Sequence, residues 1–321
     1  MWILAPLLAV GTQAAVRTDT TFDIAIAYPD DSFGRTLAEA INHTFHDISN
    51  DVGVGITGNQ LLPSSVALIL HEYPDDSSSE ALFHSLRASG IDTGAKGRNT
   101  TDVVATDVVV GHLYSGSSTI WADTMREFGV PLISPSATST ALSDRAGYPT
   151  FNRVIASNIG QAQVMGALVV SMRWDFLFIV HEDESYSSDL AAQLDTQSHE
   201  YFYTVRGKEK LASTPSDEEC DAVLDKIVES RTHLISLVGY ELAVARLLYR
   251  AGLRGMLEKP YVWIGGDTVG ADTLFPVFTG ISGAPADVLN GSLFAIAPAG
   301  PDNGMFRLVF ACIHCAGTYF P

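Results

Sequence analysis

The sequence is poor in cysteine and in positive charge. Its 321 residues include 3 cysteines, and 19 lysines and arginines stand against 37 aspartates and glutamates, which gives a formal net charge of −18. So few cysteines do not make a disulfide framework. Nucleic acids and anionic membranes are bound through clustered Lys and Arg, so the composition argues against both as partners.

Sequence motifs for catalysis and metal binding are missing as well. Gly90–Lys96 lacks the spacing of a phosphate-binding loop, no GxSxG element occurs, and the nine histidines form no HExxH pair. Cys312-Ile313-His314-Cys315 has the spacing of half a metal or redox site without a second ligand pair. We therefore expect no metal, no cofactor and no enzyme, and we expect these cysteines and Cys220 to lie in apolar helices. The run His181–Glu184 is interpreted as a solvated rim, and an α/β enzyme using its carboxylates stays an alternative.

Long apolar runs are also lacking. A transmembrane helix needs about 20 apolar residues, and the best later run, Val164–Val180, is interrupted by Arg173 and Asp175. The first sixteen residues carry no charged side chain, and a short apolar core there is followed by small residues. This pattern predicts a secretory signal peptide over residues 1–15. Three glycosylation sequons agree with secretion, with unmodified surface loops as the alternative: Asn42, Asn99 and Asn290.

What the sequence does contain is a regular alternation of strand and helix patterns. Its length suits two domains, and 46% apolar with 17% charged residues suits a globular protein. The alternation predicts the fold class α/β, with helices around a parallel sheet. The expected strands are 23–28, 66–70, 108–110, 130–133, 176–180, 233–238 and 261–264. The expected helices are 33–48, 78–88, 119–128, 159–172, 186–199, 217–230, 242–251 and 305–316.

The order of these elements predicts two lobes. Lobe one covers residues 16–154, and lobe two covers 155–295, with 155–158 as the first crossing between them. Residues 296–321 are expected to hold a return crossing and the start of an incomplete C-terminal element, which suggests a truncated chain. A repeat, Tyr-Pro-Asp-Asp-Ser, occurs at 28–32 and 73–77. It is interpreted as helix capping, with a paired-carboxylate metal site as the alternative.

Two hydroxyl-rich loops follow two predicted strands. They are Ser115–Ser118 and Ser134–Ser139. In an open α/β sheet, ligands bind beyond the carboxyl ends of the strands. The start of the following helix offers N–H groups and partial positive charge, to which the Ser115 hydroxyl adds a donor. Ser136 and Thr138 are expected to converge there. The sequence thus predicts a pocket for a small anion, with plain capping and turn roles as the alternative.

The stretch from the first of these loops to Tyr186 resembles a known family. Its motifs are Ser136-Ala137-Thr138-Ser139, Leu142-Ser143-Asp144, Tyr148-Pro149-Thr150-Phe151-Asn152-Arg153, Gln161-Ala162 and Trp174. They resemble the extracellular ligand-binding module of class C receptors, natriuretic-peptide receptors and bacterial amino-acid-binding proteins. The resemblance covers roughly residues 23–300 and is strongest over 111–186. It implies a two-lobe, periplasmic-binding-protein-like fold in which each lobe is a doubly wound, mostly parallel sheet.

The resemblance also implies roles for single residues. Ser115 would hold the ligand carboxylate together with Thr138, Tyr186 would pack on the ligand and its ammonium, and Asp267 would pair with the amine. Asn158 stands where glutamate receptors carry a second acid, and an amide is a weaker ammonium partner than a carboxylate. A packed ring and a capping acid are the structural alternatives for Tyr186 and Asp267.

As a whole, the resemblance implies the extracellular module of a cell-surface receptor. It would bind a small, amino-acid-like ligand between its lobes and signal by closure. Dimers would form through lobe one, for which the helix with Trp121 and Met125 is the candidate, and a core role for Trp121 is the alternative. Membrane attachment would come from sequence beyond this chain, and a complete chain would be secreted. The alternative is a soluble solute-binding protein for amino-acid transport.

Overall fold

The computed structural model describes residues 21–30, 32–49, 67–75, 107–266, 268, 271–282, 293–298 and 308–312. The chain divides into two compact units, Met1–Ile155 and Ala156–Pro321, and the division falls inside the segment predicted as the first crossing. Several predictions concern residues outside the described ranges. These are the signal peptide, the helix 78–88, and the residues Asn99, Asp267, Asn290 and Cys315.

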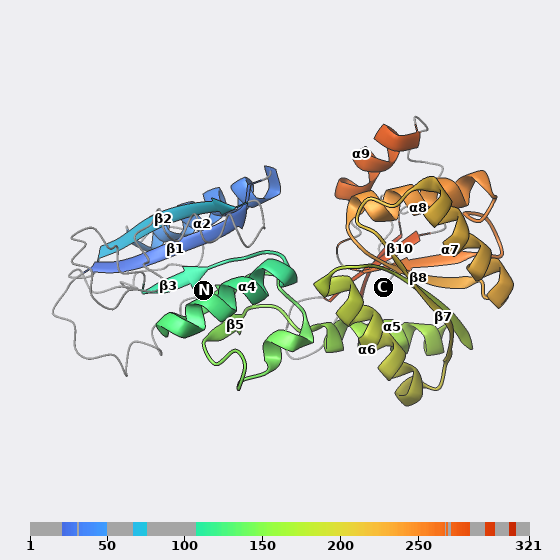
Figure 1. The fold of residues 1–321 in the computed structure, drawn as a ribbon, viewed down its shortest axis with the longest axis horizontal. Helices are drawn as coiled ribbons and strands as arrows, with labels where there is room; N and C mark the ends of the chain where they lie inside the picture. The colour runs from blue at the N-terminus through green and yellow to red at the C-terminus, as the bar shows by residue number, and fades with distance from the viewer. Residues whose placement is uncertain are drawn as a thin grey trace. The chain divides into compact units, whose positions relative to one another are not determined.

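The first unit is a parallel sheet with a helix on each face (Figure 1). Its strand order is β2-β1-β3-β4-β5. The strands are β1 (Thr21–Pro29), β2 (Ala67–Asp75), β3 (Val108–Val110), β4 (Leu132–Ser134) and β5 (Phe151–Arg153). The helices are α2 (Ser32–Ser49), α4 (Ser115–Phe128) and the short 3-10 helix η1 (Thr140–Ser143). The central strand β3 is buried throughout, as its three consecutive valines predict.

Helix α4 begins four residues before its predicted start. The sequence Ser115–Ser118, expected to be a loop, forms its first turn. The helix ends at Gly129, whose φ of 66° lies in the left-handed region that glycine tolerates. Trp121 and Met125 are 1% and 0% exposed and pack in the core of their own unit. Their side chains therefore cannot form the dimer surface that we considered, and the core alternative is correct.

The second unit is a larger sheet of order β11-β10-β9-β8-β6-β7. All neighbouring strands pair in parallel except β10 and β11. The strands are β6 (Phe176–Glu182), β7 (Thr204–Leu211), β8 (Leu234–Val238), β9 (Val262–Gly265), β10 (Leu293–Pro298) and β11 (Leu308–Cys312). The helices are α5 (Asn158–Ser171), α6 (Ser185–Tyr201), α7 (Asp217–Ser230), α8 (Glu241–Leu253) and α9 (Ala271–Ser282). Two sheets of this kind confirm the predicted fold class.

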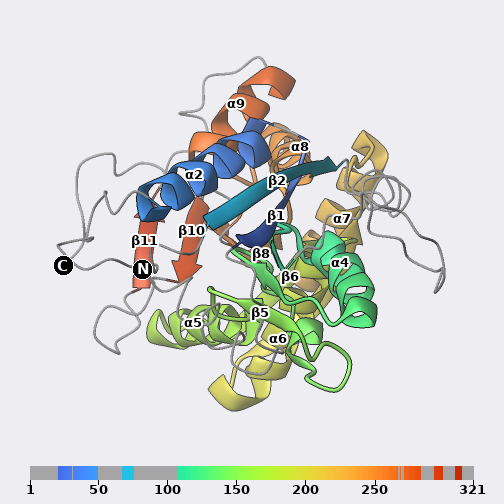
Figure 2. The ribbon, with the colours of Figure 1, turned by 90° about the vertical axis from the view of Figure 1, so that its left-hand side faces the viewer.

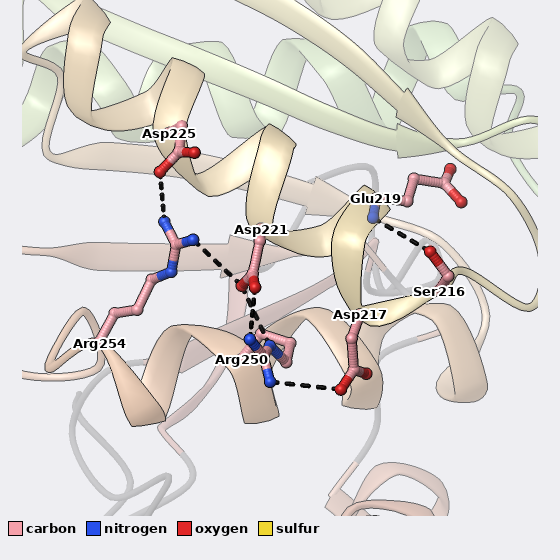
Figure 3. Close-up of polar contacts among 7 residues, drawn as sticks. All are labelled: Ser216, Asp217, Glu219, Asp221, Asp225, Arg250 and Arg254. Carbon is pink, nitrogen blue, oxygen red and sulfur yellow. Dashed lines mark hydrogen bonds and ion pairs between the residues drawn. The ribbon is translucent and has the colours of Figure 1, made fainter.

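Helices cover both faces of this sheet. α5 and α6 pack on one face around Leu177, Ile179 and Leu190, and α7, α8 and α9 pack on the other around Phe178 and Trp263. Figure 2 shows α5 and α6 on one side and α8 and α9 on the other. α7 and α8 are also joined by ion pairs on their outer surface (Figure 3).

The last strands differ from the prediction. Residues 308–312 were expected to be helical, but they form β11, paired antiparallel with β10. A short apolar run fits either structure, and pairing with a neighbouring strand decides between them. Cys312 thus lies in a strand rather than a helix. Cys220 does lie in a helix, α7, where burial raises the pKa of its thiol to about 11. The lobe boundaries at residues 295 and 296 stay a prediction.

The acidic repeat also has a described copy. Tyr28–Ser32 spans the end of β1 and the start of α2, and the Tyr28 hydroxyl donates to Glu72, 3.1 Å away. Asp30 pairs with Arg35 at 2.6 Å. Within the described residues no group of three His, Cys, Asp or Glu side chains is arranged to hold a metal. Of the second copy, residues 73–75 belong to β2.

Candidate functional site

The two hydroxyl-rich segments of the first unit, the first turn of α4 and the loop after β4, lie together as the strand-end rule predicts. The Ser136 hydroxyl donates to the Leu113 carbonyl oxygen at 2.7 Å, and the Ser139 N–H donates to the Ser115 hydroxyl at 3.2 Å. These two bonds join the loop after β3 to the loop after β4. The structure therefore brings Ser115, Ser136 and Thr138 to one edge of the sheet.

The N-terminus of α4 lies at this edge. Its N-cap residue, Tyr114, makes no side-chain capping bond. The first bond within the helix runs from the Ser118 N–H to the Tyr114 carbonyl oxygen, so the N–H groups of residues 115–117 precede it. Such N–H groups and the helix dipole favour an anion. The side chain of Ser115 is buried beside them.

Thr138 carries a hydroxyl that suits a ligand. Its side chain is 3% exposed, and its Oγ1 has no hydrogen-bond partner among the described residues. A buried hydroxyl without a partner costs about 1–3 kcal/mol. The Ser136 hydroxyl differs, because it is already used to tie the two loops. Thr138 is thus the better ligand contact of the two.

Arg153 holds the second loop in place. Its guanidinium donates to the Ser139 carbonyl oxygen at 2.8 Å and to the Ala137 carbonyl oxygen at 3.3 Å, and it also contacts the Ser143 hydroxyl. Arginine presents several donors in a rigid fork, which suits three acceptors at once. Sequence reasoning identified Arg153 as part of a motif but missed this role.

Asn158 opens the candidate site of the second unit at the start of α5. It is 0% exposed. Its Nδ2 donates to the Tyr186 carbonyl oxygen at 3.1 Å and to Asp189 Oδ2 at 2.7 Å. Both partners are acceptors, so they fix which side of the amide carries the oxygen. That oxygen, Oδ1, is buried and has no donor among the described residues.

Tyr186 is held in the core of the second unit. Its ring lies 6.0 Å from that of Tyr240, centroid to centroid, and packs in the cluster under α5 and α6. Its hydroxyl lies against Gly266, where a Cβ would stand 2.5 Å from the hydroxyl oxygen. Gly266 immediately precedes Asp267 in the chain. The ring is therefore rigid, and its hydroxyl end points to the strand end that leads to Asp267.

The acidic run after β6 is not the solvated rim that we expected. Glu182 is buried and accepts from the Tyr240 N–H at 2.8 Å, which connects the ends of β6 and β8. Glu184 is the N-cap of α6 and accepts from the N–H groups of Tyr186 and Ser187. Burial raises the pKa of the Glu184 carboxyl, and these hydrogen bonds oppose the rise. Asp183 alone in the run from 181 to 184 is exposed.

Little in the sequence indicates the roles of these two glutamates. Helix N-caps are usually Ser, Thr, Asp or Asn rather than Glu, and a charged residue at a strand end is usually solvated. The glycosylation candidate Asn42 lies on α2, where its amide donates to Glu72. Its modification stays a prediction.

Two doubly wound units with polar groups at the carboxyl ends of their strands define an α/β ligand-binding protein of two lobes. In agreement, residues 12–281 match the family described as "Receptor family ligand binding region". The chain belongs to this family. It is therefore the ligand-binding region of a receptor-like protein rather than an enzyme.

Curated relatives include receptors named for glutamate. The chain is 26% identical over 160 residues to the metabotropic glutamate receptor of Drosophila melanogaster, which covers 50% of the chain and 16% of that receptor. It is 29% identical over 165 residues to metabotropic glutamate receptor-like protein E of Dictyostelium discoideum, covering 50% and 20%. For metabotropic glutamate receptor 4 of Macaca fascicularis the identity is 27% over 165 residues, covering 51% and 18%. The chain thus matches a fifth or less of the length of these relatives.

None of the described helices combines the length and the apolar character that crossing a bilayer requires.

Proposed function

We propose that the chain binds a small, amino-acid-like ligand between its two units, as the extracellular ligand-binding region of a longer cell-surface receptor. The ligand carboxylate would lie against Ser115, Thr138 and the N–H groups at the start of α4. The ligand amine would lie against Asn158, Tyr186 and Asp267. Ser136 would keep the two loops of the carboxylate side together.

One observation carries this proposal. Each unit holds a buried polar atom that has no hydrogen-bond partner among the described residues, at the carboxyl ends of its strands: Thr138 Oγ1 in the first and Asn158 Oδ1 in the second. A threonine hydroxyl donates a hydrogen bond to a carboxylate, and an amide oxygen accepts one from an ammonium. The pair of atoms therefore suits the two ends of an amino acid.

The amine side is unusual in its first contact. An amide oxygen carries no full charge, so it binds an ammonium more weakly than a carboxylate does. Asp189 lies behind the amide and accepts from its nitrogen. Hydrogen bonds in series polarise one another, so Asp189 strengthens Asn158 Oδ1 as an acceptor. In this proposal the Asn158 amide contacts the ammonium directly. Asp189 supplies the negative charge from behind the amide, through its hydrogen bond to Asn158 Nδ2.

Closure would follow from contacts to both units. A ligand shifts a protein toward the closed form only by binding it better than the open form, and hinge closure around a ligand is a common route. Dimerisation through the first unit also remains part of the proposal. It would use the outer surface of α4, which carries Arg126 and Glu127, because Trp121 and Met125 face inward.

The test is calorimetry of the chain against the proteinogenic L-amino acids. We expect one-site binding of at least one of them, and Ser115→Ala combined with Asp267→Ala should weaken it by about a hundredfold, since two charge-assisted contacts are lost. Thr196→Ala, on the exposed face of α6, is the matched hydroxyl control and should change nothing. Unchanged affinity in the double variant would show that the assigned pocket is wrong.

A further inference from the structure

A cavity lies at the opposite edge of the second unit's sheet, where its strands begin. It has a volume of about 180 Å³ and is lined by residues just before β6, β8 and β9. Asn158 and Tyr186 stand at the other edge, where the strands end. The cavity is thus separate from the proposed amine site. At about 30 Å³ for each water molecule, it offers room for about six waters or for a small organic molecule.

A buried hydroxyl in this cavity lacks a partner. Thr232 lines it, is 2% exposed, and its Oγ1 has no hydrogen bond among the described residues. Buried polar atoms are almost always paired, so an exception calls for a ligand or an ordered water. The Thr232 N–H is used differently, because it donates to the Ser230 hydroxyl. The group of Thr232 that remains for a ligand is therefore the side-chain hydroxyl.

Two arginines without acidic partners border the same cavity. Arg173 and Arg231 line it, and neither guanidinium has an ion pair or side-chain hydrogen bond within the described ranges. Several other cations of this unit do pair with acids, as Lys208 does with Asp195 at 2.8 Å and Lys226 with Glu209 at 2.7 Å. Figure 3 shows the same for Arg250 and Arg254. Arg173 and Arg231 are both exposed, and together they place two positive charges beside this cavity.

The backbone holds both arginines at the cavity. Arg173 directly follows the C-cap of α5 and Arg231 is the C-cap of α7, with φ of 59° and 54°. Glycine is the usual residue in this left-handed conformation. A cation at a helix C-terminus also interacts well with the helix dipole, but that interaction does not account for the orphan hydroxyl of Thr232. Asp175 is the one carboxylate in the lining, so the fixed charges sum to one positive.

The remaining walls are apolar apart from His233. Trp174, Phe176 and Pro260 contribute to them. The outer face of Phe176 is covered by the Arg206 guanidinium, 3.3 Å from the ring centroid. A third cation therefore stands next to the cavity. The lining suits a molecule with one anionic end and a small apolar body.

We propose that this cavity binds the carboxylate of a small organic acid. The guanidinium groups of Arg173 and Arg231 hold the carboxylate, since arginine matches its geometry in a two-point contact. The Thr232 hydroxyl donates to one oxygen, and the apolar body of the acid packs on Trp174 and Phe176. The acid is either a free molecule or a glutamyl side chain of a peptide, and the chemistry of recognition is the same.

The test uses sodium benzoate, sodium butyrate and an acetylated, amidated tetraglutamate peptide as probes. The chain carries nitrogen-labelled tryptophan, and the indole signals of Trp174 and Trp121 are followed by NMR during each titration. We expect saturable shifts of the Trp174 signal and none of the Trp121 signal, which belongs to the first unit. Saturation by benzoate and butyrate alone supports a free acid, and saturation by the peptide as well supports a glutamyl side chain as a further source.

Variants decide whether the assigned residues carry the binding. Arg173→Asn and Arg231→Asn keep a residue that tolerates the left-handed conformation, and each should weaken binding about tenfold. Thr232→Val should weaken it about threefold, whereas Lys226→Gln, a cation elsewhere on the unit, should not change it. Failure of all three probes to saturate, or equal midpoints in both Asn variants and the parent, would overturn the proposal. Ser115→Ala should leave benzoate binding unchanged, so this proposal and the amino-acid site can fail separately.

Discussion

The two units present different chemistry at the carboxyl ends of their strands. In the first unit the groups are neutral donors: the hydroxyls of Ser115 and Thr138 and the N–H groups that begin α4. Arg153, a cation of the same unit, is occupied by loop carbonyls. In the second unit the groups are acceptors, and Glu182, Glu184 and Asp189 are fixed by backbone N–H groups or by Asn158.

This difference shows how each half manages charge. The hydroxyl and N–H groups of the first unit are neutral. They bind an anion without requiring a buried charge before the ligand arrives. The second unit does bury carboxylates, and each needs donors of its own because an unpaired buried charge is expensive. We call the carboxyl ends of the strands the donor edge in the first unit and the acceptor edge in the second. Substitutions at the acceptor edge should therefore change stability more than substitutions at the donor edge.

Exchanging the amide for an acid at the acceptor edge should have the largest effect. Asn158→Asp removes both donated hydrogen bonds and sets a carboxylate against Asp189 and the Tyr186 carbonyl oxygen. We expect the free energy of unfolding to fall by about 3 kcal/mol, since acceptors at both ends become unpaired. Urea denaturation measures it.

Adding Asp189→Asn to this variant provides the control. The exchanged pair restores a donor facing an acceptor, so the double variant should recover a large part of the lost stability. A stable Asn158→Asp single variant with raised affinity for amino acids would contradict the arrangement of Asn158 and Asp189 described above.

At the donor edge we expect a smaller change in stability, together with a loss of ligand affinity. Thr138→Val removes a hydroxyl that has no partner, so stability should stay equal or rise by up to about 1 kcal/mol. Affinity for the ligand carboxylate should fall about tenfold. Thermal denaturation and calorimetry on the same sample separate the two quantities. Ser136→Ala is the matched control, because its hydroxyl is used within the protein, and it should lower stability.

The raised pKa of Glu184 predicts a pH dependence of stability. The pKa of the Glu184 carboxyl is raised above its ordinary value of 4.5 in the folded protein. The stability that its protonated form contributes is therefore complete below pH 4.5. It is lost as the pH rises through the raised pKa. Glu184→Gln should remove that slope. Melting temperatures of both proteins between about pH 4 and 7 measure it, and parallel curves would exclude Glu184 as the group responsible.

The surface ion pairs of α7 and α8 should matter least. Arg250→Met breaks the contacts to Asp217, whose side chain is 61% exposed, and to Asp221, whose side chain is 26% exposed, but charges at the surface are partly solvated and screened. We expect a loss of stability well below that of Asn158→Asp, and a further reduction of that loss in high salt. A loss as large as that of Asn158→Asp would remove the contrast between buried and exposed carboxylates.

Much of the fold could be predicted because buried positions carry apolar residues at a regular spacing. The valines of β3 and the periodic apolar residues of α7 were assigned with the bounds that the structure has. β7 was missed, because its side chains alternate between exposed and half-buried and few are apolar. α9 was missed as well. Their structure is decided by neighbours, β6 for β7 and α8 for α9, rather than by local pattern.

The candidate site was predictable in position but not in detail. The strand-end rule brought the two hydroxyl-rich loops together correctly. It could not tell that Ser136 is occupied and Thr138 is open, because this depends on where the Leu113 carbonyl points. Asn158 and Asp189 lie 31 positions apart in the chain. No local sequence pattern predicts that they pair.

β7 has one more consequence. It ends the sheet of the second unit, and its outward positions carry Arg206, Lys208 and Lys210. An uncovered outer strand can pair with the same strand of another molecule, and charged side chains along it oppose such joining. This edge is therefore protected against aggregation by strand addition. Assemblies of this chain should therefore form through other surfaces.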